Sequence, residues 1–346
     1  MDDRIAVGVL GATGTVGQRL VRLLDGHPWF RLAEVSASES SIGQTLGDRV
    51  PDATRSAEAA ALPLRPPDSA WESRILLSAL PSGAARDVEI RLAEAGHLVV
   101  SNASAHRMRP DVPLLIPEVN ADHLDLVGSQ PWSGALITNP NCAVAGLALA
   151  LAPLNDAFGV ERVVTTSFQA ISGAGTPGPP ASGLLDNVLP FISGEEEKLA
   201  QEPQKILGSV SGSAVTPADF VVSASCTRVP VLDGHLLAVS VALGGAPSPE
   251  RIREALRSFR PPSATLELPS SPAHPLQIMD EEDRPQPRLD RDLGDGMTVA
   301  VGRIRPCEAL DVKFFVLSHN LVRGAAGAAL LNAELCWAEG VRDGGR

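Results

Sequence analysis

A strand, a glycine-rich turn and a helix at the start of the chain constrain its fold more than any other feature. Residues 5–10 are a short apolar run, residues 11–17 have the spacing G-x-x-G-x-x-G, and residues 18–24 have helical spacing. Glycines let such a turn be tight and approach a pyrophosphate, which binds at the helix N-terminus. The stretch therefore predicts a dinucleotide site in a parallel α/β sheet. The residues expected to contact the dinucleotide here are Gly11, Thr13, Gly14, Thr15 and Val16.

A β/α alternation continues as far as residue 137. Short apolar runs predict buried parallel strands, and a longer run before Gly96 predicts a helix. The expected strands are residues 31–36, 75–80, 97–100, 114–119 and 134–137, and the expected helix is residues 84–95. Residues 51–72 are rich in Pro, Ala and Ser, so we expect little regular structure there.

Polar side chains follow two of these strands. Arg107 and Arg109 come after the strand at 97–100 and are candidates for an anion site at the carboxyl edge of the sheet, although each is equally typical of a solvated arginine. The second strand ends near Ser36, Ser38 and Ser41, whose hydroxyls leave room for a ribose 2′-phosphate. Because Glu39 opposes that charge, the sequence favours NADP and leaves NAD as the alternative.

Cys142 stands between a turn and a helix. The sequence Thr-Asn-Pro-Asn precedes it, and an Ala/Leu-rich run of helical character follows. Unpaired N–H groups and the positive end of the helix dipole favour a thiolate at such a position. We therefore expect Cys142 to be a nucleophile for a carbonyl carbon; the alternative is a small buried cysteine.

The second half of the chain has another pattern. Few full helices separate its apolar runs, which indicates an α+β domain with a mixed sheet. The expected strands are residues 162–170, 220–224, 236–241 and 312–317, and a helix is expected at 324–338. Residues 261–297 are rich in Pro and charge, so we expect a long surface excursion or a subunit contact there.

Composition excludes several classes of protein. A formal net charge of −12 argues against nucleic-acid binding. The four cysteines have no zinc-like spacing, so we expect no metal, and no apolar run approaches the roughly 20 residues of a membrane span. Without a signal peptide the chain is expected to be cytoplasmic.

Taken together, motifs along nearly the whole chain resemble those of aspartate-β-semialdehyde dehydrogenases, particularly the archaeal/fungal-type branch. The matching stretches, in order, are GATGTVGQ (11–18), SNA (101–103), RM (107–108), PL (113–114), IPEVN (116–120), NPNC (139–142), QAISGAG (169–175), GEE (194–196) with Lys198, KILG (205–208), RVPV (228–231), DGH (233–235), RPQPRLDRD (284–292), VGRIR (301–305) and VRGAAG (322–327).

The resemblance implies an NADPH-dependent reduction of L-aspartyl 4-phosphate to L-aspartate 4-semialdehyde, a step of lysine, threonine and methionine biosynthesis. Cys142 would form a thioester and release phosphate, His235 would be the acid/base, and Gln169 would orient the acyl intermediate. Arg228 would bind the substrate α-carboxylate by bidentate pairing, which a planar guanidinium suits. Glu195 would face the ammonium.

Lys198 and Arg107 would hold the phosphate, with Asn102 and Asn141 completing the substrate site. Glu195 and Lys198 at i, i+3 are also typical of any exposed helix. Further residues expected to contact the cofactor are Leu80, Pro81, Ser172, Gly173 and Asn320.

The expected fold is a Rossmann-type domain of residues 1–138, completed by the C-terminal helix 321–346, and a catalytic and dimerisation domain of residues 139–320. The resemblance implies a homodimer or homotetramer. Ala143-Val144 stand where the family commonly has Ser-Thr. This departure leaves two alternative enzymes: a malonyl-CoA reductase-like enzyme acting on an acyl thioester, or an N-acetyl-glutamyl-phosphate reductase-like enzyme. A non-catalytic nucleotide sensor that kept the glycine-rich fold is a further hypothesis, and the presence of Cys142, Gln169, Arg228 and His235 together argues against it.

Overall fold

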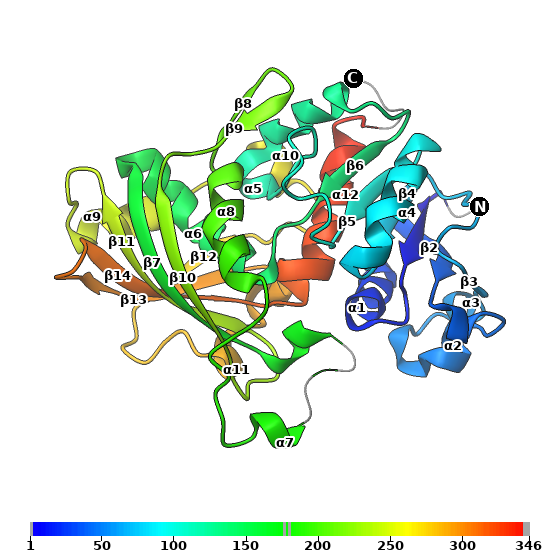
Figure 1. Ribbon diagram of the computed structural model, residues 1–346, viewed down its shortest axis with the longest axis horizontal. Coiled ribbons are helices and arrows are strands. Elements are labelled where there is room, and N and C mark those ends of the chain that lie inside the picture. The colour runs from blue at the N-terminus through cyan, green and yellow to red at the C-terminus, as the bar shows by residue number, and fades with distance from the viewer. Residues whose placement is uncertain (1–2, 176–177, 179–180, 342–346) are drawn as a thin grey trace.

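Two six-stranded sheets, each with its own helices, make up the protein (Figure 1). The structure is a computed structural model that describes residues 3–175, 178 and 181–341. The first sheet lies in the N-terminal part and the second in the C-terminal part, and the two sheets lie on opposite sides of the molecule in Figure 1.

The first sheet is parallel throughout and has the order β3-β2-β1-β4-β5-β6. This is the strand order of dinucleotide-binding α/β folds, so the expected Rossmann-type sheet is confirmed. Its strands are β1 (Ile5–Leu10), β2 (Phe30–Ser36), β3 (Leu64–Arg65), β4 (Ile75–Ser78), β5 (Leu98–Ser101) and β6 (Ala135–Thr138). The main helices beside it are α1 (Thr15–Leu24) and α4 (Ser82–Glu94).

The second sheet is mixed, as expected, with the order β10-β7-β11-β14-β13-β12. Its strands are β7 (Val160–Gln169), β10 (Val221–Arg228), β11 (His235–Leu243), β12 (Leu276–Met279), β13 (Val299–Pro306) and β14 (Val312–Ser318). Helix α6 (Cys142–Phe158) packs on this sheet and is buried along residues 143–154, because Ala and Leu fill its length. Helices α8 (Glu195–Ile206) and α9 (Pro249–Ser258) pack beside α6, and β8 (Ser209–Ser211) and β9 (Ala214–Thr216) form a separate hairpin.

The chain returns to the first sheet at its C-terminal end. Helix α12 (Gly327–Ala338) packs against β4 and β5, and its Leu330, Leu331 and Leu335 belong to the same buried cluster as Val7 of β1. A π-helical turn, η6 (Val322–Ala326), precedes α12 and contacts both α1 and α6. The two halves are therefore joined by packing at η6 as well as by the chain between β6 and α6.

Short helical segments connect these elements. They are η1 (Glu39–Ser41), α2 (Leu46–Arg49), η2 (Pro51–Ala53), α3 (Ala57–Ala60), α5 (Pro117–Asn120), η3 (Ala121–Ser129), η4 (Ile171–Ala174), α7 (Ala181–Leu184), α10 (Ser263–Leu266), α11 (Pro287–Asp290) and η5 (Leu293–Gly296). Every helix within the described residues is too short or too polar to cross a membrane.

One local expectation was wrong and two were incomplete. Residues 114–119 form only an isolated bridge at Leu114 and then the turn α5, because Pro117 begins a helical turn and the Asn120 side chain bonds the Ile116 N–H and the Leu114 carbonyl. Residues 51–72 supply the edge strand β3. Residues 261–297 are not only a surface excursion, because β12 adds a strand beside β13.

Candidate active site

Cys142 is the first residue of α6 and lies just beyond the end of β6. The side-chain oxygen of Asn141 caps this helix, accepting hydrogen bonds from the Ala143 N–H at 2.9 Å and the Val144 N–H at 3.4 Å. Cys142 is partly exposed, whereas Ala143 and Val144 are fully buried in the core of the second sheet. Ala143 and Val144, which carry no hydroxyl groups, therefore face the core.

His235, the first residue of β11, meets the thiol. Its Nε2 lies 3.2 Å from the Cys142 Sγ, although the two residues are 93 positions apart. Its Nδ1 accepts a hydrogen bond from the Ala170 N–H at 3.1 Å. Because a backbone amide can only donate, the neutral ring carries its proton on Nε2, which faces the sulfur.

Burial sets the resting charges of this pair. It raises the pKa of the Cys142 thiol to about 12, with Glu195 adding to the rise, while Arg107, Arg228 and Lys198 oppose it. Burial also lowers the pKa of His235 to about 3, and the Arg228 guanidinium contributes. Both groups are therefore neutral at pH 7, so the thiolate expected from the helix start is not the resting form, because the Asn141 side chain already pairs the first N–H groups of the helix. Three cations lie close enough to act on a negative charge at the sulfur.

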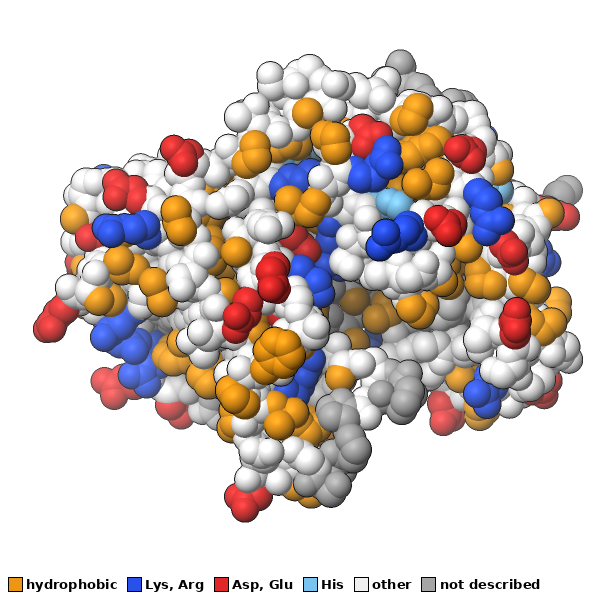
Figure 2. Space-filling view, in the orientation of Figure 1, with side chains coloured by type: hydrophobic (Ala, Val, Ile, Leu, Met, Phe, Trp, Pro, Cys, Tyr) orange, Lys and Arg blue, Asp and Glu red, His pale blue; other side chains and the backbone are white. Residues whose placement is uncertain are grey.

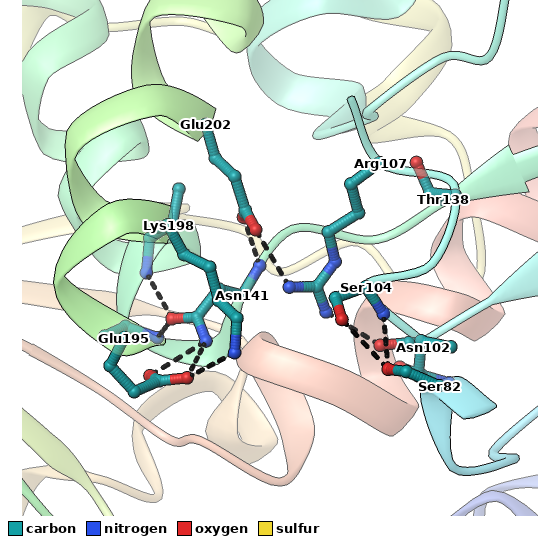
Figure 3. Close-up of polar contacts among 12 residues, drawn as sticks. Ser82, Asn102, Ser104, Arg107, Thr138, Asn141, Glu195, Lys198 and Glu202 are labelled. Atoms are coloured by element: carbon teal, nitrogen blue, oxygen red, sulfur yellow. Dashed lines mark hydrogen bonds and ion pairs between the residues drawn. The ribbon is translucent and has the colours of Figure 1, made fainter. Parts of the chain in front are cut away.

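Glu195, at the start of α8, lies among the side chains nearest the cysteine. Its carboxylate accepts hydrogen bonds from Asn141 Nδ2 at 2.9 and 3.0 Å, Gln169 Nε2 at 3.1 Å and Lys198 Nζ at 2.8 Å. Burial opposes ionisation of Glu195, but Lys198 and these hydrogen bonds hold its pKa below its usual value. It is thus a charged carboxylate, and Figure 3 shows it on the opposite side of Asn141 from Arg107.

Arg228 ends β10 directly beside Gln169, the last residue of the neighbouring strand β7. Its Nη1 donates to the Ala170 carbonyl at 2.7 Å, and the residue is 6% exposed. Gly173 leaves the space above it: a Cβ there would lie 2.9 Å from Arg228 Nη1 and 3.1 Å from His235 Nε2. The ends of the parallel strands β10 and β7 thus bring the Arg228 guanidinium and the Gln169 amide close to the pair formed by Cys142 and His235, the dyad of this site.

The two candidate arginines after β5 have different surroundings. Arg107 is buried, and donates from Nη1 to Glu202 at 2.9 Å and from Nη2 to the Asn102 carbonyl at 2.7 Å. Arg109 instead pairs with Asp111 at 2.8 Å and lies over the Trp132 ring. Arg107 therefore lies near the cysteine, and Arg109 is held away from the site. The expectation that Arg109 belongs to an anion site was wrong.

A cavity of about 940 Å³ extends from the glycine-rich turn to the Gly173 loop. On the face seen in Figure 2 the surface is hollowed between the two halves of the molecule. The expected cofactor residues that line the cavity are Gly11, Thr13, Gly14, Thr15, Val16, Ser38, Leu80, Pro81 and Gly173. Glu39 lines it as well. A Cβ on Gly17 would lie 2.1 Å from the Gly11 carbonyl oxygen, so this turn requires glycine there.

Four expected cofactor residues do not line this cavity. Ser36 and Ser41 are buried, and Ser36 Oγ accepts the Gly11 N–H at 3.1 Å, which supports the turn from behind. Asn320 Nδ2 donates to Ser172 Oγ at 2.8 Å, and its Oδ1 accepts the Gly234 N–H at 2.8 Å. These last contacts hold the loop before His235.

Three residues that sequence analysis missed touch the site. Glu202 and Lys205 of α8 contact the Arg107 loop, and Gly324 of η6 lies against the cysteine: a Cβ there would be 2.6 Å from Cys142 Cβ. Lys205 and Gly324 lie in the matched motifs KILG and VRGAAG, so the family resemblance could have pointed to both of them. In the described part of the chain no group of three or more His, Cys, Asp or Glu side chains could hold a metal.

Comparisons with known proteins agree along nearly the whole chain. Family models match at residues 6–127 (semialdehyde dehydrogenase, NAD binding domain) and 151–323 (semialdehyde dehydrogenase, dimerisation domain). The chain is 49% identical to aspartate-semialdehyde dehydrogenase of Archaeoglobus fulgidus, covering 96% of this chain and 98% of that protein. It is 42% identical to the Schizosaccharomyces pombe protein of the same name, covering 97% and 98%. A crystal structure of the Candida albicans aspartate-semialdehyde dehydrogenase with NADP has a TM-score of 0.90 and 39% identity, covering 98% and 99%.

Proposed function

The chain belongs to the aspartate-semialdehyde dehydrogenase family, and we propose that it catalyses the NADPH-dependent reductive dephosphorylation of L-aspartyl 4-phosphate to L-aspartate 4-semialdehyde. The observation that carries this proposal is the 3.2 Å contact between Cys142 Sγ and His235 Nε2 at the start of a helix. The dinucleotide cavity ends at Gly173, beside the same histidine. A nucleophile and a hydride donor would thus reach one carbon.

Cys142 is proposed to attack the acyl phosphate carbon, so that an S–C bond forms, the C–O bond to phosphate breaks and phosphate leaves with the thiol proton. When bound, the nicotinamide supplies the hydride that reduces the resulting thioester. The C–S bond then breaks, the aldehyde leaves, and the sulfur takes up a proton to regenerate the thiol. The cavity suits a dinucleotide, because the turn at Gly11 and Gly14 lines it at the N-terminus of α1 and leaves no room for a side chain at Gly17.

His235, expected from the resemblance to be the acid/base, is proposed to act as the proton donor of both steps, because its Nδ1 accepts the Ala170 N–H and its Nε2 carries the proton. Its Nε2 proton faces the sulfur, where it can stabilise a thiolate and then the carbonyl oxygen that becomes negative in each tetrahedral intermediate. The bond from the Ala170 N–H fixes the ring orientation that this role requires. Gln169 is proposed to orient the acyl group from the end of β7.

The substrate side chains suit an amino acid with two charged ends. We propose that Arg228 binds the α-carboxylate and that Glu195 binds the ammonium, while Lys198 and Arg107 hold the phosphate with Asn102 and Asn141 beside them. Glu195 is ionised, so a substrate ammonium would share its carboxylate with Lys198. Malonyl-CoA and N-acetyl-glutamyl phosphate lack that cation, so these alternatives fit the site less well. The dyad also argues against a nucleotide sensor.

The division into two domains is consistent with the proposed reaction. We propose that residues 1–138 with the helix at 321–346 form the NADP-binding domain, although 342–346 lie outside the described residues, and that residues 139–320 form the catalytic and dimerisation domain. The matched dimerisation model supports an oligomer, and we propose a homodimer or homotetramer. We further propose that the enzyme acts in the cytoplasm, in lysine, threonine and methionine biosynthesis.

The test is the reverse reaction with L-aspartate 4-semialdehyde, NADP and phosphate. Phosphate-dependent NADPH formation that Cys142→Ser lowers by at least a thousandfold is expected. Reduction of malonyl-CoA by NADPH, or phosphate-dependent oxidation of N-acetyl-glutamate semialdehyde by NADP, without turnover of aspartate semialdehyde, would assign the site to one of the alternatives. If Cys142→Ser kept wild-type turnover, the thioester mechanism would be wrong.

A further inference from the structure

We propose that Glu202 is a positioning residue that fixes the phosphate site, by holding the Arg107 guanidinium and the Asn141 backbone with one carboxylate. The inference rests on the proposed function, in which Arg107 binds phosphate. Glu202 is 2% exposed and lies on α8. Its Oε1 accepts Arg107 Nη1 at 2.9 Å, and its Oε2 accepts the Asn141 N–H at 2.6 Å. Figure 3 shows these two bonds diverging from one side chain.

The Asn141 bond connects Glu202 to the nucleophile. Asn141 precedes Cys142 and caps α6 with its side-chain oxygen. Glu202 is two helical turns beyond Glu195, so both carboxylates lie on the same buried face of α8. Glu195 bonds the side-chain amide of Asn141, and Glu202 bonds its backbone N–H. The residue that sets the start of α6 is therefore held by α8 at two points.

The Arg107 bond connects Glu202 to the anion site. Nη2 of Arg107 is held by the Asn102 carbonyl, so Glu202 and Asn102 together fix the plane of the guanidinium. Arginine has five N–H donors, of which these bonds use two. Within the described residues the buried Nε of Arg107 has no partner, which leaves donor capacity for a bound anion.

Lys205 holds the backbone of the same loop. Its Nζ donates to the carbonyl oxygens of Arg107 at 2.7 Å, Arg109 at 2.6 Å and Val112 at 2.8 Å. Side chain and main chain of the Arg107 loop are thus attached to one helix, one turn apart. Because Lys205 already fixes the backbone, loss of Glu202 is expected to disturb mainly the guanidinium and Asn141.

The experiment compares Glu202→Gln with the matched control Glu197→Gln, an exposed glutamate on the same helix. Glutamine has one acceptor oxygen and one donor nitrogen, so it can satisfy only one of the two N–H groups. The dissociation constant of inorganic phosphate is measured by calorimetry with NADP bound, together with KM for phosphate and for the semialdehyde. We expect Glu202→Gln to raise both phosphate constants at least tenfold and to change KM for the semialdehyde less than threefold. Glu197→Gln should change none of them.

A double-mutant cycle tests whether Glu202 acts through Arg107. In an Arg107→Gln background, Glu202→Gln should weaken phosphate binding less than it does in the wild-type background, because one of the two partners of Glu202 is already gone. Additive losses would overturn the proposal. So would an unchanged phosphate dissociation constant in Glu202→Gln, or equal losses in phosphate, semialdehyde and NADP binding with a lowered Tm, which is the result of a merely structural role.

Failure of the two proposals is distinguishable, because phosphate binding is measured without turnover. The wild-type protein could fail to oxidise aspartate semialdehyde while Glu202→Gln still weakens phosphate binding. That result would uphold the positioning role of Glu202 and reject the proposed substrate. If the wild-type protein showed phosphate-dependent turnover of aspartate semialdehyde but Glu202→Gln bound phosphate as tightly as the wild type, the proposed substrate would be upheld and the positioning role rejected. If the wild-type protein with NADP bound no phosphate, the positioning role would be rejected.

Discussion

Replacing Gly324 by alanine tests whether the π-helical turn η6 fixes the nucleophile. The new Cβ would lie 2.6 Å from Cys142 Cβ, 2.8 Å from Cys142 Cα and 3.0 Å from the Cys142 carbonyl oxygen. Carbon atoms pack at about 3.5–4.0 Å, so the two segments must separate by about 1 Å. Since two of the three contacts are to backbone atoms, rotation of a side chain cannot relieve them.

The separation predicts two effects of different size. Over-packing of this kind costs about 1–3 kcal/mol of folding free energy. A displacement of about 1 Å at a reacting atom lowers the rate on the order of 100-fold. Gly324→Ala should therefore lower kcat/KM by about two orders of magnitude while the folded protein persists.

The assay is phosphate-dependent NADPH formation, with thermal unfolding followed in parallel. Gly128→Ala is the matched control, because nothing lies within 4 Å of the new Cβ and neither glycine has a left-handed backbone. If Gly324→Ala kept kcat/KM within twofold of the wild-type value, the close packing of η6 on Cys142 would not determine its position. An equal loss in Gly128→Ala would point to a general effect.

Three further predictions concern charge. Burial raises the pKa of Glu89 to about 7 from an ordinary 4.5, so the native state binds the extra proton and stability falls as pH rises across that interval, by at most about 3 kcal/mol. Glu89→Gln should therefore raise Tm at pH 8 and leave it unchanged at pH 4; an equal shift at both would contradict this. Because Glu195 adds to the raised pKa of the Cys142 thiol, Glu195→Gln should accelerate alkylation of Cys142 by iodoacetamide at pH 8, with Cys142→Ser as the blank, and an unchanged or slower rate would refute it. Glu39 lines the cavity beside Ser38, so Glu39→Gln should lower KM for NADPH by roughly two- to fivefold, as one exposed charge contributes up to about 1 kcal/mol. KM for NADH should not change, and equal changes for both cofactors would exclude repulsion of the 2′-phosphate.

Surface and buried glutamates illustrate what the sequence leaves open. On α8, Glu197 is exposed and Glu202 is buried between two partners, yet both are glutamates in one polar helix. Arg107 and Arg109 were equal candidates by local pattern, and only the family resemblance singled out Arg107, which is the one that acts on the cysteine. Whether one of these side chains is buried and paired depends on which loop packs against α8, and the local sequence pattern does not give that information.

Short strands mark a similar limit. The edge strand β3 has two residues, too few for a period to be recognised, and β12 lies within the Pro- and charge-rich residues 261–297; both pair with a neighbouring strand that offers hydrogen bonds. Residues 114–119 are apolar enough for a strand, but Pro117 and the side chain of Asn120 make a turn of them instead. Local hydrophobicity was a poor guide wherever a distant partner or a capping side chain decided the backbone.

The parallel sheet, the glycine turn and the start of α6 could be predicted from local sequence, because strand and helix periods and the steric freedom of glycine act over a few neighbouring residues. How residues remote along the chain meet depends on tertiary packing. Antiparallel pairing of β11 with β7 brings His235 to Cys142, and the Ala170 N–H fixes its tautomer. Such contacts follow from how the two sheets and α6 pack, a balance of burial over the whole molecule, which no short stretch of sequence contains.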